Sequence, residues 1–152
     1  MAIPYLACMA LVAATYSLPP RVLPAIQRVE GGQAGSVSRN ADGSDDLGVM
    51  QVNTVWLRPL ADRTGMTEAA VRQRLISDPC FNIAAAGLIL RQRLAARRGD
   101  LMTAIGDYHS ATPALNRRYQ AAVTAAAAEL FVHPRVGEHP ATNPDPSPTP
   151  PR

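Results

Sequence analysis

The sequence predicts a mainly α-helical single domain, and three observations support that prediction. Its 152 residues suffice for one domain with a hydrophobic core but are few for two. Hydrophobic residues make up 47% of the chain and charged residues 18%, which excludes disorder of the whole chain. Aromatic residues make up only 5%, so an alanine-rich helical protein is favoured over a sheet built on aromatic pairs.

Residues 3 to 17 predict the first helix. Leu6, Met9 and Ala13 recur at intervals of three and four, which is typical of a helix packed on a core. The alternative is the hydrophobic region of a signal peptide, but no Lys or Arg precedes Arg21 and no good cleavage site follows. We therefore favour a structural helix, which leaves the export route open. No stretch reaches the roughly 18 apolar residues of a membrane span.

A second helix is expected over residues 20 to 30, followed by a long polar loop. The two glycines at 31 and 32 end the helix. Residues 33 to 46 have no apolar period and are rich in turn formers, and Asp42-Gly43 suits the turn of a short hairpin. Because long loops in small domains are often functional, we expect this loop or hairpin to lie near the active site.

Five more helices are expected in the second part of the chain. The clearest start is Asp78-Pro79, which supplies an N-cap and a proline in the first turn of a central helix. The expected helices span residues 55 to 63, 68 to 76, 79 to 98, 100 to 108 and 114 to 132. Seven of the final nineteen residues are proline, so we expect a domain over residues 1 to 132 and a disordered or polyproline-like tail over 133 to 152.

The charge pattern argues against a nucleic-acid partner. The net charge is +3 and all fifteen basic residues are Arg, spread from Arg21 to Arg152. A DNA-binding helix needs clustered basic residues, and the pairs Arg97-Arg98 and Arg117-Arg118 are too isolated to supply them.

Glu30 is the first candidate for a chemical role. It ends an otherwise apolar helix, and the glycines behind it let other backbone approach closely. Burial would raise the pKa of such a carboxyl group, which suits a general acid near neutral pH. The alternative is a solvated surface residue, and Glu30 taken alone favours that alternative.

Five sequence motifs add evidence about the fold and the function. They are RVEGG at 28 to 32, NADGSDDLGVMQVN at 40 to 53, WLRPL at 56 to 60, DPCFNIAAAGLIL at 78 to 90, and GDYHSATP at 106 to 113 with Arg118-Tyr119 behind it. In order and spacing they resemble the specialised lytic transglycosylases, which are goose-lysozyme-like muramidases associated with type IV secretion and conjugation. The resemblance covers about residues 6 to 125. It implies a lysozyme-like α+β fold.

The resemblance also assigns roles to single residues. Glu30 matches the catalytic glutamate, although Gly31 stands where a Ser usually follows. Met50, Gln51 and Asn53 match a substrate-binding motif whose Gln lines the glycan cleft. We expect Asn53 to be mainly structural.

Two further positions complete the expected site. Tyr108 matches the aromatic hydroxyl expected to bond the glutamate, and His109 stands where the family usually has Asn beside the substrate. Each assignment has a structural alternative: Gln51 and Asn53 could bond backbone groups, and Tyr108 could be a core aromatic. Trp56 is expected in the core rather than in the site.

Cys8 and Cys80 match two cysteine positions of the family, so the resemblance implies a disulfide between them. A structural disulfide indicates a periplasmic or secreted protein. The cysteines lack the spacing of a zinc site, and the family needs neither a metal nor an organic cofactor.

The resemblance implies a single-carboxylate mechanism on peptidoglycan glycan strands. Glu30 would protonate the oxygen between N-acetylmuramic acid and N-acetylglucosamine, then take a proton from the muramoyl C6 hydroxyl, which closes a 1,6-anhydro ring. Components of a secretion or conjugation machinery are further candidate partners. The alternatives are a hydrolytic muramidase in which Asp42, Asp45 or Asp46 activates water, and a non-catalytic peptidoglycan-binding assembly module.

Overall fold

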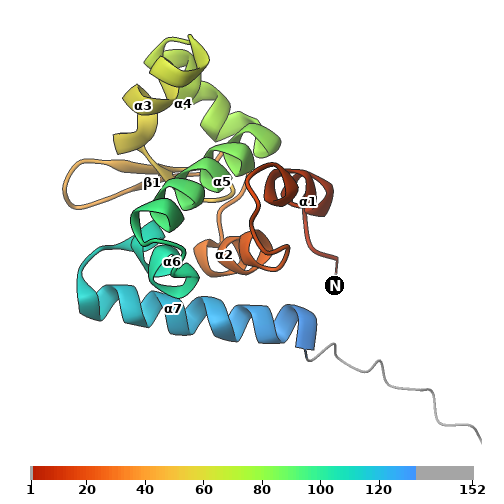
Figure 1. Ribbon diagram of the computed structural model, residues 1–152. Coiled ribbons are helices and arrows are strands. Elements are labelled where there is room, and N and C mark those ends of the chain that lie inside the picture. The colour runs from red at the N-terminus through yellow and green to blue at the C-terminus, as the bar shows by residue number, and fades with distance from the viewer. Residues whose placement is uncertain (1, 133–152) are drawn as a thin grey trace, which may run out of the picture.

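The computed structural model describes residues 2–132. A long helix passes through the centre of the fold, another helix runs along one edge, and the fold also contains a small sheet (Figure 1). Within these residues the helices are α1 (Leu6–Thr15), α2 (Val22–Glu30), α3 (Leu57–Thr64), α4 (Glu68–Ser77), α5 (Pro79–Ala96), α6 (Leu101–His109) and α7 (Pro113–Ala127). A 3₁₀ turn, η1 (Thr54–Trp56), precedes α3, and a π-helical turn, η2 (Ala128–Val132), follows α7. The mainly α, lysozyme-like prediction is confirmed.

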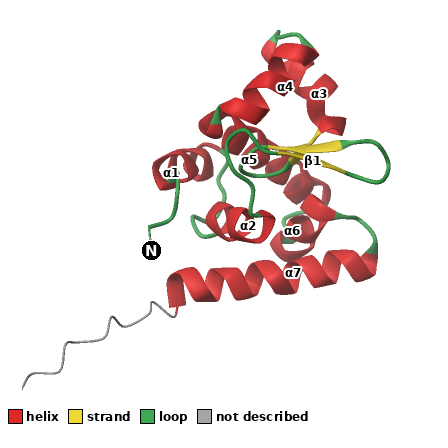
Figure 2. Cartoon of the chain, turned by 180° about the vertical axis from the view of Figure 1, so that it is seen from behind, coloured by secondary structure: helices red, strands yellow, loops and turns green. Residues whose placement is uncertain are grey.

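The sheet has three antiparallel strands in the order β1 (Val37–Arg39), β2 (Asp45–Leu47) and β3 (Val52–Asn53). The expected hairpin is present between β1 and β2, and it extends away from the helices in Figure 2. Its turn is held by Asp42, whose Oδ1 accepts hydrogen bonds from the Ser44 N–H at 2.9 Å and the Ser44 hydroxyl at 2.6 Å. The short third strand was not expected, because two residues carry no detectable period.

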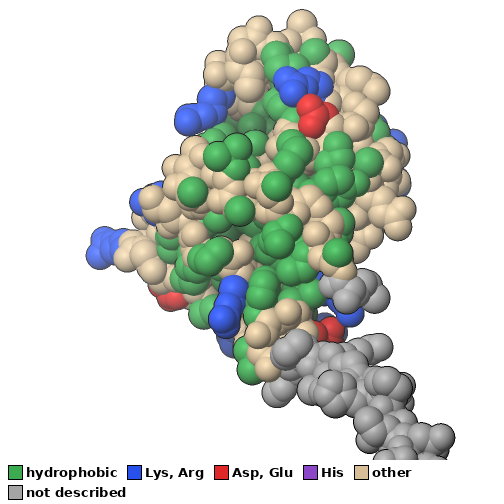
Figure 3. All heavy atoms as spheres, turned by 90° about the vertical axis from the view of Figure 1, so that its right-hand side faces the viewer, with side chains coloured by type: hydrophobic (Ala, Val, Ile, Leu, Met, Phe, Trp, Pro, Cys, Tyr) green, Lys and Arg blue, Asp and Glu red, His purple; other side chains and the backbone are tan. Residues whose placement is uncertain are grey.

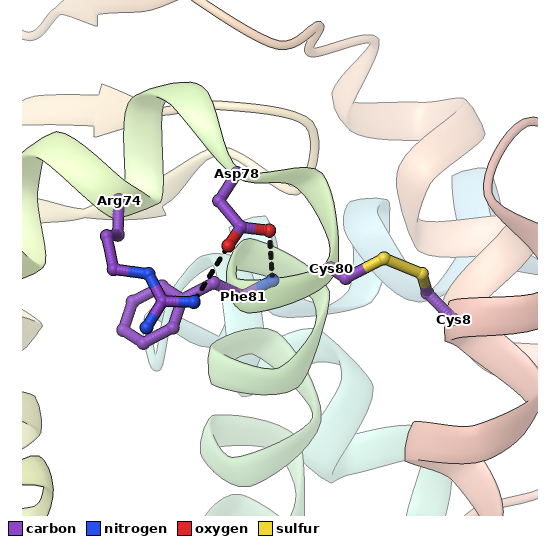
Figure 4. The surroundings of a disulfide bond; sticks show 5 residues. All are labelled: Cys8, Arg74, Asp78, Cys80 and Phe81. Atoms are coloured by element: carbon purple, nitrogen blue, oxygen red, sulfur yellow. Dashed lines mark hydrogen bonds and ion pairs between the residues drawn. A yellow bond between two sulfur atoms is a disulfide. The ribbon is translucent and has the colours of Figure 1, made fainter.

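Helix α5 passes through the middle of the fold, between α1, α4 and α6 (Figure 1). Its start is fixed as expected: the Asp78 carboxylate accepts a hydrogen bond from the Phe81 N–H at 3.0 Å, and Pro79 lies in the first turn. Arg74 pairs with the same carboxylate at 2.8 Å and lies over the Phe81 ring (Figure 4). The largest fully buried side chains around α5 include Leu23, Ile26, Leu47, Met50, Ile83 and Leu90.

The first helix packs on the core through Met9, Val12 and Ala13, as its spacing predicts. Its outer side is also apolar, with Leu11 70% exposed, and apolar side chains gather on that face of the molecule (Figure 3). A disulfide joins Cys8 to Cys80, with their Cα atoms 5.5 Å apart, and so ties α1 to the start of α5 (Figure 4). The expected pairing is confirmed.

Several boundaries differ from the expected ones for local reasons. Helix α2 begins at Val22 rather than at residue 20, which places Pro24 in the first turn, where a missing N–H costs nothing. The segment expected to begin a helix at residue 55 starts with η1, because the Asn53 side chain accepts a hydrogen bond from the Val55 N–H and caps that turn. The prediction for residues 133 to 152 lies outside the described residues. In the part of the chain that is described, no helix has the length and apolar character needed to cross a membrane.

Candidate active site

A cleft of about 640 Å³ is bounded by the end of α2, the sheet, η1, α5 and α6. Its size falls within the range of small-molecule sites. Five of the six expected catalytic and substrate-binding residues line this cleft, namely Glu30, Gln51, Asn53, Tyr108 and His109. The hairpin reaches the cleft through Asn40 and Asp46, in agreement with its expected position near the site.

Glu30 is the last residue of α2, and its partly buried carboxyl group lies at the cleft. Burial raises its pKa from 4.5 to about 7, a hydrogen bond from Tyr119 acts in the opposite direction, and the negative charge of Asp46 adds to the rise. A Cβ atom at Gly32 would overlap the Gly48 carbonyl oxygen, so a glycine here lets the loop approach the acid. Near neutral pH the group is therefore part protonated, as a general acid requires.

The aromatic hydroxyl that holds Glu30 belongs to Tyr119, which corrects the expectation for Tyr108. The Tyr119 hydroxyl donates to Glu30 Oε1 at 2.6 Å, whereas the Tyr108 hydroxyl donates to the Met50 carbonyl at 2.8 Å. Tyr108 thus supports the loop behind the acid. Burial, followed by the charge of Glu30, raises the pKa of both phenols, so each stays a proton donor at neutral pH.

His109 lines the cleft and lies against the residue that orients the acid. Its ring stacks on the Tyr119 ring with centroids 5.0 Å apart and planes 7° from parallel. This contact restricts the tilt of the Tyr119 ring. The expected place of His109 in the site is therefore supported by geometry, through Tyr119 rather than through Glu30 directly.

Met50 does not contact the cleft, contrary to its expected role in substrate binding. Its side chain is fully buried in the core. Its backbone is held on both sides, since the N–H donates to Asn82 Oδ1 at 2.9 Å and the carbonyl accepts from Tyr108. Asn82, also fully buried, donates to the Leu47 and Leu75 carbonyls at 2.7 and 2.8 Å. Met50 and Asn82 therefore fix the loop from inside the core.

Gln51 and Asn53 line the cleft and also bond within the protein. Gln51 has a φ of 51°, in the left-handed region, and its amide nitrogen donates to the Gly48 carbonyl at 2.9 Å. The Asn53 amide donates to Ser44 Oγ at 3.0 Å and to Asp46 Oδ1 at 2.9 Å. Asn53 thus has the structural role expected of it, and Gln51 combines a backbone contact with a place in the cleft wall.

Only one of the three hairpin aspartates considered as a hydrolytic base lines the cleft. That residue is Asp46. Asp45 is buried and paired with Arg39 at 2.6 Å and Arg72 at 3.0 Å, and Asp42 is engaged in the hairpin turn.

The α5 wall of the cleft carries two arginines. Arg97 forms a two-pronged pair with Asp107, with Nη2 2.9 Å from Oδ1, and this bond is the main reason that the pKa of Asp107 is lowered. The Arg93 guanidinium lies over the Trp56 ring, with Cζ 5.2 Å from the ring centroid. Trp56 packs, partly buried, against the hydrophobic core as expected, and it also lines the cleft.

The sequence contains only weak signals for the site residues that were not predicted, which are Tyr119, Arg93 and Arg97. Tyr119 belongs to the buried α7 stripe of Asn116, Tyr119, Val123 and Ala126, so its spacing indicated burial but not its partner. Arg93 and Arg97 lie four apart on α5, on the face that also carries Ile89. No group of three or more potential metal ligands occurs within residues 2–132.

The chain was compared with known proteins. A family model described as the transglycosylase SLT domain matches residues 7–131. The chain is also 30% identical over 98 residues to three curated proteins named invasion protein IagB, from Salmonella typhimurium strains SL1344 and LT2 and from Salmonella typhi. The match covers 64% of this chain and 58% of each relative, so the chain spans less than two thirds of their length. The match over residues 7–131 shows that the chain belongs to the transglycosylase SLT domain family, whose members are lytic transglycosylases.

Proposed function

We propose that this chain is a peptidoglycan lytic transglycosylase that cleaves the β-1,4 bond between N-acetylmuramic acid and N-acetylglucosamine and leaves a 1,6-anhydromuramoyl end. The observation that carries the proposal is the Glu30 carboxyl group, which lines the cleft with a pKa of about 7 and is bonded by Tyr119. Membership of the transglycosylase SLT domain family supports it.

The mechanism uses the two protonation states of one carboxyl group. Protonated Glu30 donates its proton to the glycosidic oxygen as that bond breaks, and the resulting carboxylate then removes the proton of the muramoyl C6 hydroxyl. The C6 oxygen attacks C1 and closes the ring, so no water is consumed. A pKa near 7 makes both transfers accessible at neutral pH. Tyr119 holds Oε1 and fixes the direction in which the carboxyl group acts.

We also propose that the cleavage opens the wall locally for a secretion or conjugation apparatus. The five sequence motifs and the relatives named invasion proteins support this role. The Cys8–Cys80 disulfide is consistent with work outside the cytoplasm.

A hydrolytic muramidase is the second candidate, because Asp46 lines the same cleft as Glu30 and its charge raises the pKa of that residue. A second carboxylate in the cleft is what a water-activating base requires. The hydrogen bond from Asn53 to Asp46 gives this carboxylate a structural role as well.

Digestion of purified sacculi in heavy-oxygen water separates the two reactions by product. The transglycosylase leaves unlabelled anhydro ends, one water lighter than hydrolysed ends, and Asp46→Asn changes the rate only modestly. Labelled reducing ends would instead establish the muramidase. In that case Asp46→Asn should lower the rate of cleavage nearly as much as Glu30→Gln. Glu30→Gln should lower either activity at least about a hundredfold. Binding of sacculi with no soluble product would favour the assembly module.

A further inference from the structure

One wall of the cleft is formed by one face of α5 and by Arg97, the residue that caps its C-terminus. Ile89, Arg93 and Ala96 are spaced by four and seven positions, which places their side chains along one side of the helix, and Arg97 follows one turn after Arg93. Two of these four residues are arginines, one turn apart. The wall therefore presents positive charge in the same cleft that Glu30 lines.

The two arginines differ in what they bond. Arg97 is satisfied by the two-pronged pair with Asp107, and the same carboxylate accepts a further hydrogen bond from the Asn116 amide at 2.9 Å. Arg93 has no ion pair with any residue between 2 and 132, and within that range its buried Nε has no hydrogen-bond acceptor. The charge of Arg93 helps to lower the pKa of Asp107, but among the described residues no carboxylate lies within ion-pair distance of an Arg93 nitrogen.

Arg93 is nevertheless held in place. Its guanidinium lies over the Trp56 ring, with Cζ 5.2 Å from the centroid, and Trp56 itself follows the cap formed by Asn53. An arginine packed on an aromatic ring keeps the edge of its planar guanidinium group available to acceptors, and its N–H donors match the two oxygens of a carboxylate. Asp107 cannot serve as that partner, because Arg97 and Asn116 already engage it.

We infer that Arg93 binds a carboxylate of the substrate and so makes the cleft select anionic glycan over neutral glycan. The inference rests on the proposed function, since it names a feature of the peptidoglycan strand cleaved there. Two sources offer that chemistry. One is the free lactyl carboxylate of a muramoyl residue without peptide, and the other is a carboxylate of the attached stem peptide.

Binding is measured in the Glu30→Gln background, so that no cleavage interferes. The probes are three soluble oligosaccharides of equal length: peptide-bearing peptidoglycan strands, the same strands after enzymatic removal of the peptides, and neutral N-acetylglucosamine oligomers. The variants are Arg93→Gln, Arg93→Lys and the control Arg91→Gln. Arg91 is exposed on the same helix and does not line the cleft, so its loss changes the net charge equally.

Arg93→Gln should weaken binding of an anionic strand about tenfold or more and leave the neutral oligomer unchanged. Arg93→Lys should give an intermediate loss, because it keeps the charge without the fork. A loss confined to peptide-bearing strands identifies the stem carboxylate, and a loss on peptide-free strands identifies the lactyl carboxylate. Arg91→Gln should stay within about twofold of the parent on all probes.

Two results would overturn the inference. An equal loss on neutral and anionic strands would show that Arg93 only supports Trp56, and an equal loss in Arg91→Gln would show that general charge is responsible. If Arg93→Gln unfolds, Arg93→Met, which keeps the apolar stem on Trp56, takes its place.

Cleavage of peptide-bearing strands by the otherwise unaltered protein is assayed in parallel. Absence of that cleavage refutes the proposed function, whereas the binding comparison alone tests Arg93.

Discussion

The Glu30 carboxyl group combines partial burial, one hydrogen bond and a neighbouring negative charge. This environment lowers the free energy of unfolding once the carboxyl group is ionised. Below pH 4.5 Glu30 is protonated in the folded and the unfolded chain, whereas above about pH 7 the folded chain carries a charge that is poorly solvated. The free energy of unfolding should therefore decrease as the pH rises from 4.5 to about 7, and it should stay constant at higher pH.

Glu30→Gln should remove that cost. At pH 8 we expect the variant to be more stable than the parent by up to about 3 kcal/mol, and at pH 4 we expect the two to be nearly equal. Urea unfolding followed by circular dichroism at pH 4, 6 and 8 measures the difference. A stability difference that does not change with pH would contradict the raised pKa of Glu30.

Tyr119→Phe and Tyr108→Phe form a matched pair of variants. The Tyr119 hydrogen bond lowers the pKa of Glu30, so its loss should raise that pKa and move the alkaline limb of the pH–rate profile to higher pH. We also expect kcat to fall roughly ten- to a hundredfold, because the carboxyl group is less well directed. Tyr108→Phe should leave the alkaline limb in place and lower mainly the stability of the loop. The same displacement of that limb in both variants would refute the distinct roles.

The sequence pointed to Glu30 through the resemblance carried by the RVEGG motif, and the structure places its carboxyl group at the cleft. The residue that bonds this carboxyl group was not predicted. The resemblance assigned the hydroxyl to Tyr108, whereas the structure shows that the Tyr119 hydroxyl bonds Glu30. Which hydroxyl reaches Glu30 depends on how α7 packs against α2, and no local pattern encodes that packing.

Among the structural elements, the junction after α2 brings the loop and the acid together. Gly31 has a φ of 66° and open space around its Cα, whereas a Cβ at Gly32 would meet the Gly48 and Val49 carbonyl oxygens. We expect Gly31→Ala to cost about 1 to 2 kcal/mol of stability and to retain most activity. Gly32→Ala should displace the loop and reduce sacculus cleavage by at least about tenfold. Melting temperatures and initial rates of both variants test this, and equal activity losses would contradict it.

The disulfide joins two elements that are 72 residues apart in the sequence. By the chain-entropy model, closing a loop of this length contributes about 4 kcal/mol to stability. The double variant Cys8→Ala/Cys80→Ala should therefore lose about that amount in chemical unfolding while keeping its cleavage chemistry, because neither residue lines the cleft. A loss well below 1 kcal/mol would show that the helix contacts alone hold α1 in place.

Helix positions were predictable because caps and apolar spacing are local signals. Asp78-Pro79 fixed the start of α5 in the sequence and in the structure. The two-residue strand β3 and the cleft wall on α5 were not predictable, since both depend on contacts between segments that are distant in the chain.

For the molecule as a whole, the cleft is built entirely from residues before 132, as far as the described part of the chain shows. Removal of residues 133 to 152 should therefore leave the rate of sacculus cleavage within about twofold of the full chain, because that segment has few apolar residues able to join a core. Steady-state rates of the full and truncated chains test this. A large loss of intrinsic activity would show that the tail contributes to the cleft.

The bond between Glu30 and Tyr119 also links the state of this carboxyl group to completion of the fold. The two residues are 89 positions apart, so a chain that appears from its N-terminus exposes Glu30 long before Tyr119. Until α7 has docked, the carboxyl group lacks the burial and the hydroxyl that give it a pKa near 7, and it titrates like any glutamate in water. In the proposed reaction, an incompletely folded chain therefore lacks the carboxyl group in its active form. The proposed cleavage then requires α7 to be packed against α2, and a chain that has not finished folding should not cut peptidoglycan.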